Sequence, residues 1–245
     1  MSIEARREIP GIMVSIGTPA AAQVLMEKLL ESDTTLRFRT MSALNKLQRL
    51  HPEIETDTKM LETVLAAEIL GHYRSYQILD KLGTANGEDS IAHALTESMQ
   101  QELERIFRVL GLLYPQLDIH SAHVGVQSKS AAVHDNALEF LDNVLKPQLR
   151  EMLLPLLDSK VTVRERAHRA QRLVHTNIEN QEQAVAALVA SEDPWLRSCG
   201  AYAVGAFGLR SLESQLNRLL NDSDPLLRET ARTAKLRLEA LVTKA

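Results

Sequence analysis

The chain has little cysteine and few aromatic residues. Of its 245 residues only Cys199 is a cysteine, and Phe, Trp and Tyr together make up 4%. A lone cysteine excludes an internal disulfide and any cysteine-based zinc cluster, and it suits a reducing cytoplasm. Alanine and leucine carry most of the apolar content, and both favour helix over strand. The composition therefore predicts a helical protein without an internal cross-link.

The chain also lacks a basic excess and a membrane-spanning run. Its formal net charge is −4, whereas a protein that neutralises many phosphates usually carries a large positive excess. We therefore expect no nucleic-acid partner. The longest uncharged run, residues 9–26, is broken by Pro10, Gly11, Gly17 and Pro19. No signal peptide is evident, so we expect a cytoplasmic protein or the cytoplasmic portion of a membrane protein.

What the chain does contain is a repeat. Asp-Pro-x-Leu-Arg occurs at residues 193–197 and again at 224–228, and small residues follow each arginine at steps of three. The same frame begins at Arg37 and Arg164, and a weaker copy has His134 in the arginine place. Intervals of 30, 33 and 31 residues separate positions 134, 164, 197 and 228. Periods of 20 to 50 residues are typical of stacked helical or mixed repeat units.

Each copy predicts the second helix of a helical hairpin. Aspartate before the helix is a good N-cap, and proline fits the first helical position, where no N–H is needed. Small residues three and six positions after the arginine lie on one helix face, where they allow a neighbouring helix to approach closely. No persuasive strand pattern of useful length is present.

These patterns predict an all-α fold, an α-solenoid of HEAT-like helical hairpins forming a single domain over residues 1–245. N-terminal hairpins are expected in 1–56 and C-terminal repeats in 115–245. The segment 57–114 differs, because it predicts two longer helices, 57–82 and 89–113, separated by the turn-rich "GTANGED". We expect this long helical hairpin to be inserted between the repeats.

Two resemblances follow from these residues. The stretch "DPWLRSCGAYAVGAFG" resembles the HEAT-like repeat of phycobilin lyase subunits and many bacterial scaffolds. The order of "REIPGIMVSIGTPAAAQVLMEKLL", "LRFRTMSALNKLQR", "RIFRVLGLLYPQLDI" and the 193–208 repeat resembles the HEAT-repeat region of certain bacterial fusion proteins. In that family the repeats follow an ATP/ADP-carrier-like transporter domain and often precede a cyclic-nucleotide-binding domain. The resemblance implies a transporter-associated scaffold. The first helix has no partner hairpin upstream, which is the pattern expected of a domain excised from a longer protein.

Candidate chemistry is sparse. His120 and His123 are three residues apart beside Asp118, so they could share a helix face toward a metal. No third ligand is evident, and we expect no metal. Cys199 falls on the small-residue face of its helix, which predicts a buried and inert thiol. Phosphate-binding loops and serine-hydrolase motifs are absent from the sequence. We therefore expect no catalytic residues, no cofactor and no enzymatic activity.

The recurring arginines allow two interpretations. They could line a groove for an acidic ligand, or they could pair with the capping aspartates and form a structural ladder between neighbouring hairpins. Their recurrence beside those aspartates favours the ladder, whose members are Arg37, Arg164, Arg197, Arg228, Asp33, Asp193 and Asp224.

Three apolar residues form the candidate interaction surface. Trp195 is the single tryptophan, and it serves either packing or an interface. Ile12 and Val14 belong to a nearly uncharged first helix, which predicts a sticky N-terminal end that packs against a preceding segment or mediates self-association.

The leading functional hypothesis is a non-catalytic scaffold that binds a partner protein or a neighbouring domain of a longer parent chain. The alternative is an enzyme on a HEAT scaffold, either a tetrapyrrole lyase-type subunit or an alkylpurine DNA glycosylase-like protein. A glycosylase needs a basic concave face with aromatic residues, which one tryptophan and a net charge of −4 oppose. The local basic stretch "RERAHRAQR" keeps that alternative open.

Overall fold

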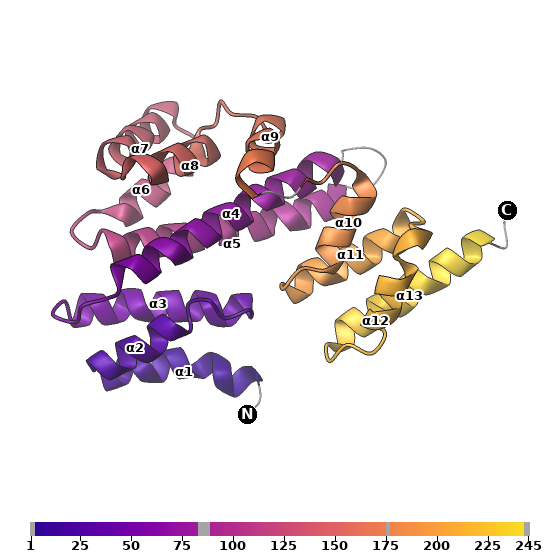
Figure 1. Cartoon of the computed structure of the whole chain (residues 1–245), viewed down its shortest axis with the longest axis horizontal. Coiled ribbons are helices and arrows are strands. Elements are labelled where there is room, and N and C mark those ends of the chain that lie inside the picture. The colour runs from indigo at the N-terminus through magenta and orange to yellow at the C-terminus, as the bar shows by residue number, and fades with distance from the viewer. Residues whose placement is uncertain (1–2, 83–88, 175–176, 243–245) are drawn as a thin grey trace. The chain divides into compact units, whose positions relative to one another are not determined.

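The computed structural model describes residues 3–82, 89–174 and 177–242, which contain thirteen α-helices, one short 3-10 helix and no strand (Figure 1). The prediction of an all-α fold is confirmed. None of the described helices combines the length and apolar character needed to cross a membrane. The helices are α1 (Ile3–Ile16), α2 (Pro19–Glu27), α3 (Thr34–Leu50), α4 (Thr58–Leu82), α5 (Asp89–Leu113), α6 (Ile119–Val126), α7 (Ala131–Val144), α8 (Pro147–Leu157), α9 (Val163–Val174), α10 (Gln181–Val189), α11 (Pro194–Ala206), η1 (Arg210–Leu212), α12 (Glu213–Leu219) and α13 (Pro225–Val242).

The chain folds into two compact units. Unit 1 comprises residues 1–72 and 101–162, and unit 2 comprises residues 73–100 and 163–245. The two long helices predicted for 57–114 are present as α4 and α5, and each is divided between the units. The predicted "GTANGED" turn lies mostly outside the described residues. A solenoid is compatible with this helical content, and its continuity along the whole chain stays a prediction.

The first three helices of unit 1 form a small packed group. α1 packs on α3, and α2 contacts both. Thr18 caps α2 by accepting the Ala21 N–H, and Asp33 caps α3 by accepting the Leu36 N–H at 2.8 Å. Gly17 connects α1 to α2 with a φ of 64°, a left-handed conformation that suits glycine at a helix C-terminus.

The last helices of unit 2 repeat that arrangement. α11 packs on α13, and α12 contacts both. Asp193 and Asp224 accept backbone N–H groups in the first turns of α11 and α13, as the capping argument predicted. Gly208, with a φ of 67°, follows α11 as Gly17 follows α1.

The small residues of the repeat are buried, which confirms their predicted packing role. The pairs three and six positions after each arginine are all buried: Thr40 and Ala43, Ala167 and Ala170, Gly200 and Ala203, Ala231 and Ala234. Gly200 and Gly205 come so close to neighbouring helices that an added Cβ would stand 2.6 Å from a backbone atom of Val189 or Ala234. Backbone proximity at this face therefore fixes how the hairpins stack.

Candidate functional site

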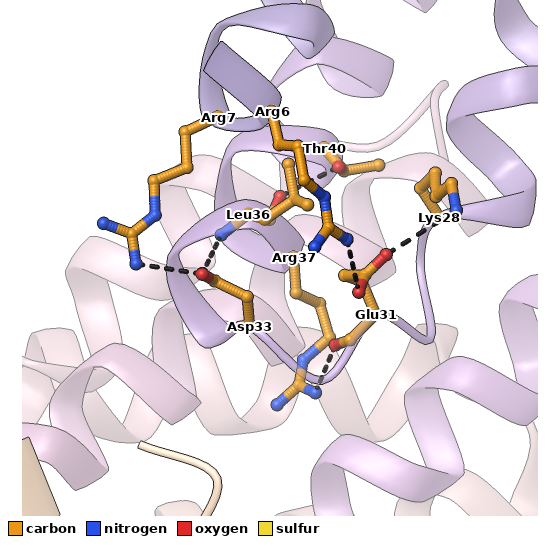
Figure 2. A network of polar contacts seen from close by, with 8 residues as sticks. All are labelled: Arg6, Arg7, Lys28, Glu31, Asp33, Leu36, Arg37 and Thr40. Atoms are coloured by element: carbon orange, nitrogen blue, oxygen red, sulfur yellow. Dashed lines mark hydrogen bonds and ion pairs between the residues drawn. The ribbon is translucent and has the colours of Figure 1, made fainter. Parts of the chain in front are cut away.

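The turn before α3 holds a network of ion pairs (Figure 2). Arg7 on α1 donates to Asp33 Oδ2 at 2.9 Å, and Arg6 donates to Glu31 Oε1 at 2.9 Å. Arg37 on α3 donates to the Glu31 carbonyl oxygen at 2.9 Å. The network therefore ties the first helix of unit 1 to the turn that precedes the third.

The corresponding turn in unit 2 is held in the same way. Arg197 on α11 pairs with Asp222 Oδ2 at 3.5 Å, and Arg228 on α13 donates to the Asp222 and Ser223 carbonyl oxygens at 2.7 and 2.9 Å. In unit 1, His134 on α7 also contacts the end of the next helix, because its Nε2 lies 3.1 Å from the carbonyl oxygen of Leu157, the last residue of α8. Residues at the repeat position therefore link one hairpin to the next turn.

None of the predicted pairs between a repeat arginine and a capping aspartate occurs among the described ion pairs, and these residues have other partners. Asp33 pairs with Arg7 and not with Arg37, whereas Asp193 and Asp224 serve as helix caps. Each capping carboxylate lies at the start of its own helix, where it accepts backbone N–H groups, whereas the repeat arginine donates to a carbonyl oxygen before the cap or pairs with an acidic residue outside it. Arg164 is exposed and makes no ion pair with a described carboxylate, so it is not part of the ladder. Arg7, 30 residues before Arg37, was missed, because Pro10 and Met13 stand where the repeat has small residues.

Replacing Arg197 with alanine should lower the free energy of unfolding by about 1–3 kcal/mol, because Asp222 is left mostly buried without its cation. Arg164→Ala is the matched control at the same repeat position. Its exposed side chain should change stability by less than about 0.5 kcal/mol. Urea unfolding followed by circular dichroism measures both values, and equal losses for the two variants would contradict a structural ladder.

A second polar cluster lies within unit 1, between α3, α4 and α5. The Glu68 carboxylate accepts a hydrogen bond from Arg105 Nε at 2.8 Å and forms an ion pair with Arg37, whose Nε lies 2.9 Å from Glu68 Oε1. One turn further along α4, His72 Nδ1 lies 2.8 Å from Glu102 Oε2. All of these side chains are mostly or fully buried. The cluster holds the long hairpin against α3 and has no open cavity beside it among the described pockets.

The two residues of the predicted N-terminal surface differ in exposure. Ile12 is 55% exposed on α1, and its role in an interaction stays a prediction, whereas Val14 is only 8% exposed. Val14 faces α3, because two residues along a helix turn the side chain by about 200°. It is therefore an ordinary core residue, and Ile16 joins Ile12 on the exposed face.

Trp195 lies at an apolar groove of unit 2, formed by α5, α11 and α13. Its indole is 52% exposed, and Leu226 opposite is 56% exposed. The groove encloses about 280 Å³ and is lined by Ser90, Ile91, Ala94, Trp195, Ser198, Cys199, Tyr202, Leu226 and Thr230. None of these described lining residues carries a charge. The exposed tryptophan therefore belongs to a continuous apolar surface.

Cys199 lies in this groove and is half-buried. Burial raises the pKa of its thiol to about 11, and the charge of Asp193 adds to the rise. The thiol therefore stays protonated at neutral pH. The predicted full burial is wrong, because the helix face that carries Cys199 borders the groove.

The histidines at 120 and 123 border a separate cleft of about 510 Å³ in unit 1, between α3, α5 and α6. His123 stacks on Phe107 with ring centroids 4.5 Å apart, and burial lowers its pKa. Asp118 is occupied as the N-cap of α6, where hydrogen bonds from Ser121 lower the pKa of its carboxyl. No group of three potential ligands that could hold a metal occurs among the described residues. The cleft thus brings the two histidines together without completing a metal site.

Comparison of the chain with protein-family models, with curated proteins and with solved structures finds no match. The Trp195 groove was only partly foreseen, because Ile91 and Ala94 approach it from a distant part of the chain.

Proposed function

We propose that this chain is a non-catalytic scaffold that binds a partner protein through the Trp195 groove of unit 2. The observation that carries the proposal is the exposed indole beside Tyr202 and Leu226 in an uncharged groove. Exposed apolar patches on soluble domains often mark interaction sites, and tryptophan and tyrosine are enriched among the residues that dominate binding energy.

The chemistry of the groove supports binding more than catalysis. Its described lining residues offer hydroxyls and a thiol, and none of them carries a carboxylate, imidazole or amine that could act as a general acid or base. The thiol itself is held in its protonated form. A partner side chain or helix that buries apolar area fits these walls better than a polar substrate does.

The resemblance to transporter-associated HEAT regions supports a role within a larger membrane protein. In this proposal the chain acts in the cytoplasm, as a HEAT-like module that couples neighbouring domains of a bacterial membrane protein. The arginine links between hairpins support a repeat scaffold of this kind, because they hold successive turns at fixed spacing.

A photo-crosslinking experiment tests the groove. Benzoylphenylalanine introduced at position 226 in cells should give a discrete crosslinked product with one protein, identified by mass spectrometry and then purified. Trp195→Ser should weaken the reconstituted complex at least tenfold, or by about 1.4 kcal/mol or more. Quenching of the single tryptophan gives an independent readout in the parent protein.

Leu236→Ser is the matched control, since Leu236 is another exposed leucine of α13 that does not line the groove. It should change affinity less than about twofold, within the small range expected of residues outside a hot spot. An absence of crosslinking at position 226, or equal effects of the two serine variants, would count against the proposed surface.

A further inference from the structure

α9 of unit 2 has a face with mostly positively charged side chains. Its sequence, VRERAHRAQRLV, contains four arginines and one glutamate, which gives the helix a charge of +3 in a chain whose net charge is −4. Arg164, His168, Arg169 and Arg172 are exposed, whereas Ala167 and Ala170 are buried. The steps from 164 to 168 and from 168 to 172 place these residues on one side of the helix, with Arg169 and Glu165 beside them.

The charge of this face is not neutralised within the part of the chain that the structure describes. Arg164, Arg169 and Arg172 form no ion pair there, whereas Arg39, Arg108 and Arg232 each pair with a carboxylate. Arg166 instead stacks over the Tyr76 ring, with its guanidinium carbon 4.9 Å from the ring centroid. In a chain with 32 acidic residues, three unpaired arginines on one twelve-residue helix stand out.

Tyr73, a second tyrosine close to the arginines of α9, does not supply a negative charge that would neutralise them. Tyr73 is fully buried, and burial raises its pKa to about 12 although Arg169 and Arg166 are close enough to oppose the rise. The phenol is therefore neutral at physiological pH. Like charges three or four residues apart, such as Arg169 with Arg172, destabilise a helix by a few tenths of a kcal/mol per pair. The arrangement thus weakens the free helix and favours a bound anion.

The residue types indicate which anion. The basic residues are arginines and one histidine, with no lysine, and the guanidinium group binds phosphate through two parallel hydrogen bonds. Arg164 and Arg172 lie about 12 Å apart along the helix axis, the length over which one strand of duplex DNA carries three to four phosphates. This face has no exposed aromatic or large aliphatic residue that could insert into a lipid surface or anchor a protein.

We propose that the exposed face of α9 binds the phosphate backbone of a nucleic acid, without reading its base sequence. The net charge of −4 led us to expect no such partner, but a formal sum over the chain averages this local basic face with acidic residues elsewhere. The site lies on a different helix from the Trp195 groove, so the two proposals stand independently.

Fluorescence anisotropy with a labelled 20-nucleotide DNA, single-stranded in one arm and duplex in the other, tests the proposal. The parent protein should bind at 50 mM NaCl, and the affinity should fall about 40-fold by 200 mM NaCl, as expected for a slope of about −2.7 from three phosphate contacts. The arm with the higher affinity identifies the form of nucleic acid.

Replacing Arg164, Arg169 and Arg172 together with glutamine should lower the affinity at 50 mM NaCl at least tenfold and flatten the salt dependence. The matched control replaces Arg210, Arg218 and Arg232 with glutamine, which removes the same charge from exposed arginines of the same unit. This control variant should bind DNA within about threefold of the parent affinity, and its salt dependence should keep the parent slope. Circular dichroism checks that both variants fold.

Three results would overturn the proposal. One is an absence of DNA binding at 50 mM NaCl, and another is an equal loss of binding in the two triple variants. The third is binding of polyglutamate or of phosphatidylserine vesicles as tight as that of DNA, with the same dependence on the three arginines. That result would assign the face to an acidic protein or a lipid surface.

Discussion

Glu68→Ala is expected to lower the free energy of unfolding by about 3–5 kcal/mol, the range seen when one partner of a buried ion pair is removed. Glu68 accepts a hydrogen bond from Arg105 Nε at 2.8 Å and forms an ion pair with Arg37 Nε at 2.9 Å, and its side chain is 7% exposed. Without it, these two guanidinium groups in the interior of unit 1 lose the carboxylate that they share. Chemical denaturation at neutral pH, followed by far-ultraviolet circular dichroism, measures the loss.

Glu104→Ala is the control for this prediction. Glu104 also pairs with an arginine, Arg108, but both side chains are about one-third exposed. Pairs of this kind contribute about 0–1 kcal/mol. If the two glutamate variants lost similar stability, burial would not be the property that makes the Glu68 cluster important.

Gly205→Ala should destabilise the protein by about 1–3 kcal/mol, although alanine is the better helix former. Its new Cβ would lie 2.6 Å from the Ala234 Cα and 2.9 Å from the Ala234 Cβ, so α11 and α13 would have to separate. Thermal and urea unfolding should both show the loss.

Gly71→Ala makes the same substitution at an open position and should have the opposite effect on stability. Gly71 is exposed within α4, and an added Cβ would meet no atom within 4 Å. Alanine should therefore raise stability by about 0.5–1 kcal/mol, its ordinary advantage in a helix. A gain at position 205 as well would show that the close approach of α11 and α13 relaxes without cost.

Short sequence patterns predicted the positions of the helices well. The Asp-Pro starts of α11 and α13 depend on hydrogen bonds within one helical turn, so residue type alone indicates them. The small residues of the repeat were placed correctly for a similar reason, because helical spacing decides which side chains share a face.

Partners distant in sequence could not be predicted in the same way. Arg197 pairs with Asp222 and not with its own cap Asp193, a choice that depends on how one hairpin stacks on the next. Glu68 on α4 links α3 to α5, because it pairs with Arg37 and Arg105. Each of these arginines lies more than thirty positions from Glu68 in the sequence. Ile12 and Val14 look alike in an apolar run, and only the position of α3 separates the exposed residue from the buried one.

The division of the chain between units has a consequence for synthesis on the ribosome. Unit 2 takes its first part from residues 73–100, but the rest begins at residue 163, after unit 1 has been completed. Ile78, Leu82, Ile91, Leu95 and Met99 pack in the same core as residues of α10–α13. These apolar side chains emerge from the ribosome long before their partners do. Because neither unit is a single continuous segment, a premature stop after residue 162 would leave that part of the long hairpin without its core, exposed to chaperones and proteases.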